Sequence, residues 1–446
     1  MILAPYYEIA TYIWSPYLRG WVSRELKKRG ITPVLLWGVD AVKTKYMEAI
    51  KDKDVKGTLG VGHGNNDVFT GQDYEPIMKV GDKITDDYKR QCIAPVSCLV
   101  GNKLMPWLVE QGVPCTVGEV TEYWFTAEKI NQNGEDPEED KLLKYYMYAE
   151  YVFWYRLAEG FTAGEAYRMM IREYYRQAKL AESVDEDTAY YVRYDADNRK
   201  FFGDQNWRMV SGTETSILYK AVGMRDAKNK QDTITISGSV VAKDGTIPSG
   251  KVKVIVNDQE QEVAIRQDGS FTTVFTFTWN KNIEMTYDIQ IIYEGDLTHG
   301  YLPKYDETQI TIEPITIPTK IEIENIQAER SGPVVAVSVV GRLVDKDGNP
   351  VVNRDIEVLV GNGKLYTGYD TTGKDGTFKV TVSKSFPILQ TKAVVIVRFK
   401  GDDTYLYSED SRIVEFPPNW EVLKVIAGAL AIVGTAIAII LGMLLH

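Results

Sequence analysis

The sequence predicts an α/β domain built on a mostly parallel sheet with flanking helices, followed by two all-β sandwiches and a transmembrane helix. Three observations support this order. Apolar runs alternate with helical patterns over residues 1–225, which is typical of a parallel sheet. Strands in which apolar and polar residues alternate fill residues 231–315 and 318–416. Finally, residues 425–445 carry no charged side chain.

Strands and helices follow one another regularly in the first domain. The expected strands are residues 32–37, 57–61, 91–96 and 114–118, and the expected helices are residues 42–51 and 103–111. A polar stretch at residues 131–140 precedes two long helices and is a candidate site for activating cleavage. Thr162 and Glu165 open the second of these helices as a capping box. The aromatic residues between 145 and 155 are expected to pack in the core.

One histidine and one cysteine in this domain directly follow predicted strands. His63 stands two residues after the apolar run 57–61, and Cys98 stands two residues after the run 91–96. If these strands are neighbours in a parallel sheet, both side chains emerge at the same edge. A thiol with a pKa of about 8.5 is only slightly ionised at neutral pH, so it needs a nearby imidazole. Cys98 is therefore predicted to attack a scissile carbonyl, with His63 as the general base and then the general acid.

The order of these motifs resembles the caspase-like cysteine peptidases, and most closely their gingipain-type branch. The resemblance rests on a His-Gly after one strand, a Ser-Cys followed by Gly after the next, and a Leu-x-x-Gly-x-x-x-Gly-Glu-Ala segment at residues 157–166. Residues 202–205 match in part the Gly-Asp-Pro turn that closes gingipain-like domains, with Gln205 in place of the proline. The resemblance implies a caspase-like sheet and a Cys–His dyad that requires no third residue. It also implies the backbone amides of Gly64 and Cys98 as oxyanion donors.

The β-rich part of the chain contains one module twice. The Lys-Asp-Gly at residues 243–245 recurs at residues 346–348, and alternating runs surround both copies. Asp-Gly turns between such runs are typical of β-hairpins. The two modules resemble the immunoglobulin-like sandwiches of bacterial and archaeal surface proteins, without the antibody-type cysteine pair. Aspartates in the turns are compatible with calcium binding or with ordinary hairpin chemistry.

The apolar C-terminal segment is expected to form a transmembrane helix within residues 422–446. At roughly 1.5 Å per residue, a helix of this length crosses a hydrocarbon core of about 30 Å. The prediction is a single-pass C-terminal anchor with the lipid bilayer as a partner. Its orientation stays open at this stage. The N-terminus shows no secretory signal, which favours a cytosolic body, whereas the β-modules are typical of exported stalks. A signal upstream of this chain would place the catalytic domain outside the cytoplasm.

Composition narrows the possible partners and cofactors. The net charge of −11 argues against nucleic acid as the main partner. Only three histidines occur, which argues against a zinc site of several histidines, and no cofactor or metal is expected. The three cysteines all lie in the first third of the chain, so no disulfide framework supports the later modules. Cys92 and Cys115 are interpreted as structural core residues.

Three functions remain open from the sequence. The first is a membrane-anchored cysteine endopeptidase that cleaves protein or peptide substrates. The second is a catalytically inactive surface or adhesion protein with a degenerate peptidase domain. The third is a cytosol-facing, tail-anchored caspase-like signalling protease. The spatial relation of His63 to Cys98 discriminates the first two.

Substrate specificity is not fixed by the sequence. Four carboxylates near predicted strand ends would attract a basic substrate side chain, or they are ordinary solvated groups: Asp40, Asp67, Glu119 and Glu122.

Overall fold

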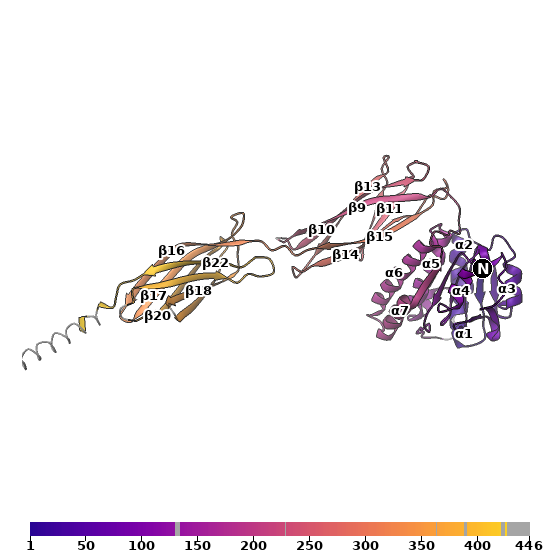
Figure 1. Ribbon diagram of the computed structural model, residues 1–446, viewed down its shortest axis with the longest axis horizontal. Coiled ribbons are helices and arrows are strands. Elements are labelled where there is room, and N and C mark those ends of the chain that lie inside the picture. The colour runs from indigo at the N-terminus through magenta and orange to yellow at the C-terminus, as the bar shows by residue number, and fades with distance from the viewer. Residues whose placement is uncertain (130–133, 228, 363, 388–389, 421–423, 426–446) are drawn as a thin grey trace, which may run out of the picture. The chain divides into compact units, whose positions relative to one another are not determined.

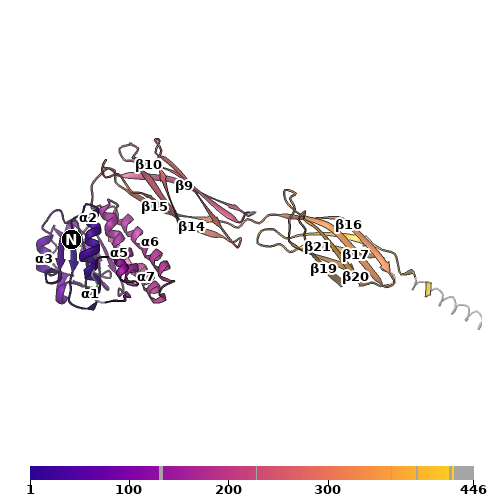
Figure 2. The same cartoon turned by 180° about the vertical axis from the view of Figure 1, so that it is seen from behind.

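The computed structural model describes residues 1–129, 134–227, 229–362, 364–387, 390–420 and 424–425. Contacts divide the chain into two compact units. One unit comprises residues 1–221, 235–273 and 287–309, and the other comprises residues 222–234, 274–286 and 310–446. Figures 1 and 2 show a helix-rich N-terminal region followed by regions built from strands.

The N-terminal region contains one six-stranded sheet in the order β2-β1-β3-β6-β7-β8. Its strands are β1 (Ile2–Ala4), β2 (Leu35–Trp37), β3 (Gly57–Val61), β6 (Cys92–Val96), β7 (Cys115–Glu119) and β8 (Arg199–Gly203). The first five in this order run parallel, and β8 runs antiparallel to β7. A separate two-stranded sheet joins β4 (Val68–Thr70) to β5 (Pro76–Lys79). The prediction of a mostly parallel sheet is confirmed.

Helices cover both faces of this sheet. They are α1 (Ile9–Tyr17), α2 (Ser23–Lys28), α3 (Lys43–Ala49), α4 (Leu104–Glu110), α5 (Leu143–Ala158), α6 (Ala163–Ala181) and α7 (Glu186–Asn198). One apolar cluster includes Ile2 together with buried residues of α1, α5, α6 and α7, and a second includes Leu3 with residues of α3 and α4. Figures 1 and 2 show α3 and α6 on opposite sides of the domain. Because successive strand residues point to opposite faces, both faces carry apolar side chains.

Two local predictions can be compared directly with the structure. The capping box at α6 is present, with the Glu165 N–H donating to Thr162 Oγ1 over 3.2 Å and the Thr162 N–H donating to Glu165 Oε2 over 2.9 Å. The strand β1, in contrast, was not predicted from its short apolar run. It is fully buried between β2 and β3 and begins the domain's sheet. Three residues buried on both faces show no alternation, so periodicity does not reveal such a strand.

The β-rich regions form two modules with the same strand order. The first contains the sheets β13-β10-β9 and β12-β11-β14-β15, and the second contains β16-β17-β20 and β19-β18-β21-β22. The strands of the first are β9 (Thr215–Asp226), β10 (Gln231–Ala242), β11 (Lys251–Val256), β12 (Gln259–Ala264), β13 (Ser270–Thr278), β14 (Met285–Tyr293) and β15 (Lys304–Ile312). Those of the second are β16 (Thr319–Ser331), β17 (Val334–Asp345), β18 (Asp355–Asn362), β19 (Lys364–Thr371), β20 (Thr377–Ser385), β21 (Lys392–Phe399) and β22 (Ser408–Glu415).

Apolar residues from both sheets of the second module form one core. It combines alternate residues of β17, such as Val337, with alternate residues of β18, such as Val358. This arrangement is typical of a sandwich of antiparallel sheets, and it confirms the all-β character of the repeated modules. Strand pairing in the first module begins at Thr215 with β9, earlier than the predicted start at residue 231.

The predicted transmembrane helix at residues 422–446 lies outside the described residues, apart from Lys424 and Val425. In the part of the chain that the structure describes, no helix has the length and apolarity needed to cross a membrane.

Candidate active site

The register of two neighbouring strands places His63 and Cys98 at the same edge of the sheet. β3 and β6 pair in parallel, with Val61 opposite Val96 as the last pair of the ladder. His63 and Cys98 each stand two residues beyond that pair. The Gly62 N–H also donates to the Val96 carbonyl over 3.3 Å, so the two loops leave the sheet together. Parallel strands therefore bring the imidazole and the thiol to the carboxyl edge, where α/β sheets bind ligands.

Gly64 lets the histidine loop pack directly against the cysteine turn. A β-carbon at this position would lie 2.8 Å from the Cys98 carbonyl oxygen and 2.8 Å from Val100 Cγ1, and closer still to Ser97 Oγ. Real β-carbons do not approach backbone oxygen atoms that closely. Glycine is thus required here by the close approach of the two loops. The sequence predicted its use in catalysis but not this packing role.

Two backbone N–H groups at this edge have no protein acceptor among the described residues. Gly64 lies opposite Phe69 in an isolated antiparallel β-bridge. The two hydrogen bonds of this bridge are made by the flanking residues: the Thr70 N–H donates to the His63 carbonyl, and the Asn65 N–H donates to the Val68 carbonyl. The Gly64 N–H occupies a non-hydrogen-bonded position of the bridge. Likewise, no group among the described residues accepts a hydrogen bond from the Cys98 N–H. Both groups are therefore available to a bound oxyanion.

Cys98 sits on a tight turn with unusual backbone geometry. Leu99, the next residue, has a φ of 63°, in the left-handed region that non-glycine residues rarely adopt. Its N–H donates to the Thr121 carbonyl over 2.7 Å. The Cys98 Sγ accepts a hydrogen bond from the Tyr123 N–H over 3.4 Å. The loop after β7 therefore holds both the turn and the half-buried sulfur, and such strain is frequent at functional sites.

His63 is surrounded by groups that the sequence did not single out. Its Nε2 lies 3.3 Å from Glu8 Oε1, the distance of an ion pair but without the geometry of a hydrogen bond. The ring stacks on Tyr74, with centroids 5.1 Å apart, and Tyr7 meets Tyr74 edge-on at 4.9 Å. The imidazole is 41% exposed although its Nε2 is buried.

The Glu8 carboxylate is held in place as the N-cap of α1. Its two oxygen atoms accept hydrogen bonds from the Ala10 N–H over 2.9 Å and the Thr11 N–H over 2.8 Å. The positive end of a helix stabilises a negative charge at this position. Glu8 follows β1, and the chain order of the sheet reverses between β1 and β3. A switch point of this kind is where open α/β sheets form binding crevices.

The electrostatic surroundings of Cys98 disfavour its thiolate. Burial raises the pKa of the Cys98 thiol, the Tyr123 N–H lowers it, and the carboxylates of Glu122, Glu119 and Asp195 raise it. The thiol is therefore protonated at neutral pH in the chain without substrate. Within the described ranges, no hydrogen bond joins the thiol to His63.

A buried charge cluster lies beneath the cysteine turn. The β6–β7 ladder contains only two registered pairs, ending at Ile93. Beyond it, the Arg199 guanidinium donates to the Pro95 carbonyl over 3.2 Å and contacts both Glu119 and Glu150. The guanidinium therefore donates hydrogen bonds to the Pro95 carbonyl, which lies beyond the paired part of β6 and β7. Burial raises the pKa of Glu119 to about 8.

The four carboxylates proposed for substrate attraction do not form one group. Asp67 pairs with Lys103 over 2.6 Å, and Glu119 is buried against Arg199. Asp40 is exposed beyond β2, the strand at the edge of the sheet. Of the four, Glu122 is the exposed carboxylate that raises the pKa of the Cys98 thiol.

Glu8 and Tyr74 are the site residues that sequence reasoning missed. A signal for Glu8 existed, because Glu8 and Thr11 form a capping box at the start of α1. Because β1 was not predicted as a strand, nothing in the sequence placed this helix cap at an edge of the sheet. Tyr74 carries no signal, since it reaches His63 through the left-handed backbone of Asp73 and of its own position.

The turn aspartates of the β-modules are occupied by their own turns. The Asp244 carboxylate accepts from the Thr246 N–H over 2.9 Å, and the Asp375 carboxylate accepts from the Thr377 N–H over 3.2 Å. Such contacts are ordinary hairpin chemistry. Within the described residues, no group of three His, Cys, Asp or Glu side chains is placed to hold a metal ion.

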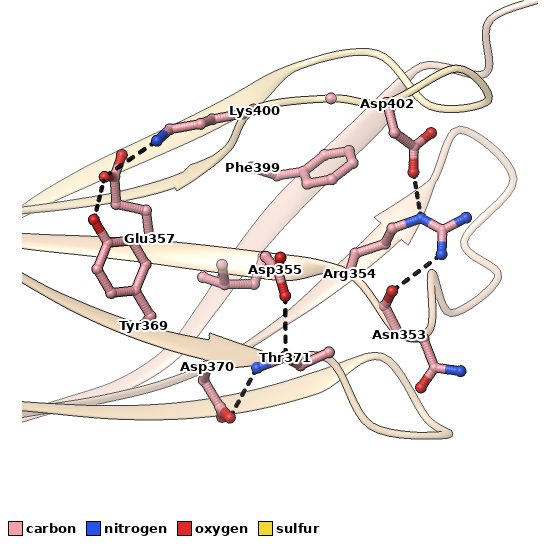
Figure 3. A pocket seen from close by; sticks show the side chains of 12 residues that line it. Asn353, Arg354, Asp355, Glu357, Tyr369, Asp370, Thr371, Phe399, Lys400 and Asp402 are labelled. Atoms are coloured by element: carbon pink, nitrogen blue, oxygen red, sulfur yellow. Dashed lines mark hydrogen bonds and ion pairs between the residues drawn. The ribbon is translucent and has the colours of Figure 1, made fainter.

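A hollow of about 750 Å³ lies on the second module, and Figure 3 shows its charged walls. Glu357 accepts from the Tyr369 hydroxyl over 3.2 Å and pairs with Lys400 over 3.4 Å, while Arg354 pairs with Asp402. These charges already have partners within the module.

Comparison with protein-family models finds no match, and no curated protein matches the chain. Similar solved structures include an invasin described as a bacterial integrin-binding protein, with 16% identity and a TM-score of 0.27. That similarity covers 46% of this chain and 39% of the invasin chain.

Two further similar structures lie at still lower TM-scores. A 1.5-MDa bacterial ice-binding adhesin shares 14% identity at a TM-score of 0.21, over 49% of this chain and 69% of the other. The chicken interferon gamma receptor alpha chain shares 12% identity at 0.19, over 44% and 97%. Likeness at this level carries no argument, so the assignment of the β-modules rests on their own strand pairing.

Proposed function

We propose that the chain is a cysteine endopeptidase with a caspase-like, gingipain-type catalytic domain that uses His63 and Cys98. The observation that carries the proposal is the matched register of the two residues beyond adjacent parallel strands. The N–H groups of Gly64 and Cys98, which have no acceptor among the described residues, support a site for the oxyanion of a tetrahedral intermediate.

The proposed reaction begins with proton transfer from the Cys98 thiol to His63. Because Nε2 faces Glu8, Nδ1 is the nitrogen that receives this proton. The thiolate attacks the scissile carbonyl, and the carbonyl electron pair moves to the oxygen held by the Gly64 and Cys98 amides. Collapse of the intermediate expels the amine, which takes the proton from His63. Water then hydrolyses the acyl-enzyme and regenerates the thiol.

Glu8 has a positioning role in this mechanism. A carboxylate 3.3 Å from Nε2 stabilises the imidazolium that forms when the thiol is deprotonated. This matters because burial, together with the carboxylates around Cys98, raises the pKa of its thiol, so the thiolate is not preformed.

The decisive experiment measures cleavage of a mixed peptide library by wild type, Cys98→Ala and His63→Ala. We expect wild-type cleavage that iodoacetamide abolishes, and background rates in both variants. Cys115→Ala is the matched control, because its thiol is buried in the same sheet but away from the carboxyl edge. Equal, background turnover in wild type and both variants would contradict the proposal.

A catalytically inactive surface or adhesion protein is the second candidate. Two observations favour it: the pKa of the Cys98 thiol is raised, and no hydrogen bond joins this thiol to His63 within the described residues. In that case the β-modules carry the function, and the library experiment gives no cleavage.

We propose that the β-modules form a spacer and that residues 422–446 anchor the chain in a membrane, with the catalytic domain outside the cytoplasm. The repeated sandwich topology supports the spacer. The uncharged sequence of residues 425–445 supports the anchor. Added protease should digest the modules on intact cells. Full protection would instead support the cytosol-facing signalling protease.

A further inference from the structure

Cys92 and Cys115 are nearest neighbours on adjacent strands. They form the first registered pair of the parallel β6–β7 ladder, and both are fully buried. Their side chains belong to the same apolar cluster, so they lie on the same face of the sheet. Neighbouring strands are about 4.8 Å apart, which falls within the range of Cα separations that disulfides span, about 4.4–6.8 Å.

The residues on either side of this pair are glycines. The row across the sheet reads Gly57 on β3, Cys92 on β6, Cys115 on β7 and Gly203 on β8. Glycine carries no side chain, so each sulfur has the other cysteine as its only side-chain neighbour along the row. A β-carbon on Gly57 would lie 2.5 Å from the Trp154 ring, so tryptophan closes the row on that side.

We propose that Cys92 and Cys115 form a disulfide bond across the β6–β7 ladder. The two thiols lose two protons and two electrons, and a low-molecular-weight disulfide such as oxidised glutathione is reduced to two thiols. One cysteine thiolate attacks the small disulfide, and the second cysteine then displaces the remaining glutathione from the mixed disulfide. Because both sulfurs are buried in the folded sheet, the bond closes during folding.

The bond leaves the proposed nucleophile free. Cys98 lies six residues beyond Cys92, on the turn that follows the opposite end of the strand; a fully extended chain of that length spans at most roughly 20 Å at about 3.3 Å per residue. The inference does not depend on the peptidase proposal, since it concerns the other two cysteines.

The test counts thiols in the full chain after unfolding and refolding in glutathione buffers. The protein is alkylated with iodoacetamide under denaturing conditions and weighed intact. We expect three alkylated thiols after refolding in a reducing buffer, one after refolding in an oxidising buffer, and none for oxidised Cys98→Ala. Three alkylated thiols in the oxidising buffer would overturn the proposal.

Peptide mapping identifies the bonded partners. Cleavage after Arg90, Lys103 and Lys129 places Cys92 and Cys98 in one peptide and Cys115 in the next. The Cys98→Ala variant removes the ambiguity, because a link between these peptides can then involve only Cys92. Loss of the link in Cys98→Ala would show that Cys98, not Cys92, pairs with Cys115.

A second measurement does not require refolding. The same thiol count is made on the chain exported to an oxidising compartment of the expression host, and its melting temperature is compared with and without reductant. We expect reductant to lower the melting temperature by about 5 °C in wild type and in Cys98→Ala. It should leave Cys92→Ala unchanged. Equal melting temperatures for wild type in both conditions, with three free thiols, would overturn the proposal.

Discussion

The two ends of strand β6 use the same residue type in opposite ways. At its start, Cys92 is fully buried, registered with Cys115 and flanked by glycine. Two residues beyond its end, Cys98 is half-buried on a turn whose next residue has a left-handed backbone. The regular end of the strand is a site of packing. The irregular end carries two N–H groups that have no acceptor among the described residues, and several carboxylates lie near it.

The contrast separates cysteines within the regular strand ladder from the cysteine that we propose as the nucleophile. Both occur in apolar runs, and burial raises the pKa of both Cys98 and Cys115. Of these cysteines, Cys98 stands where two loops leave the sheet together, packed against the loop that carries His63. Place in the sheet, and not local composition, separates the two proposed roles. Variants at each end therefore test the comparison.

Gly64→Ala should give the largest effect at the irregular end. The added methyl group would lie 2.8 Å from the Cys98 carbonyl oxygen and push the two loops apart. The oxyanion donors would then move away from the thiol, and we expect kcat/KM to fall at least about 100-fold. The measurement is peptide cleavage, with melting temperature recorded in parallel. Gly373→Ala is the control, because its β-carbon meets nothing closer than 3.4 Å. Unchanged cleavage by Gly64→Ala would show that the site does not require glycine at this position.

Glu8→Gln should give a smaller loss, of about 10- to 100-fold in kcat/KM. Glutamine keeps one of the two oxygen atoms that cap α1 and removes the charge beside His63. The melting temperature should therefore change little while the pH–rate profile shifts. The measurement is kcat/KM as a function of pH. A large drop in melting temperature with no change in the pH profile would indicate a purely structural role.

Glu119→Gln should change stability by the smallest amount, and in a pH-dependent way. Burial raises the pKa of Glu119 from 4.5 to about 8, so the folded chain keeps a proton that the unfolded chain releases. Between these values the unfolded state binds fewer protons, and stability falls as the pH rises from about 4.5 through 8.

The expected result is a melting temperature that declines less in Glu119→Gln than in wild type, by about 3 to 6 °C between pH 5 and pH 8. Glu122→Gln, at an exposed residue three positions away, is the matched control and should follow wild type. Parallel curves for all three proteins would show that Glu119 does not carry this pH dependence.

Much of the fold follows from the sequence because its signals are local. The apolar run before His63 corresponds to β3, Gly57–Val61, and the capping box at Thr162 opens α6 as expected. The repeated Asp-Gly turns predicted two copies of one module, and the two modules have the same strand order. Each of these depends on residues close together along the chain.

The sequence by itself determined the alternation of strands and helices, the repeated β-modules and the fact that His63 and Cys98 each follow a strand. Only the tertiary structure decided that Glu8 faces His63, that Gly64 packs on the Cys98 turn, and that Cys92 and Cys115 are adjacent. These contacts join segments whose proximity depends on strand order and register. Neither is written in any local pattern, because a strand's neighbours are chosen by the packing of the whole sheet.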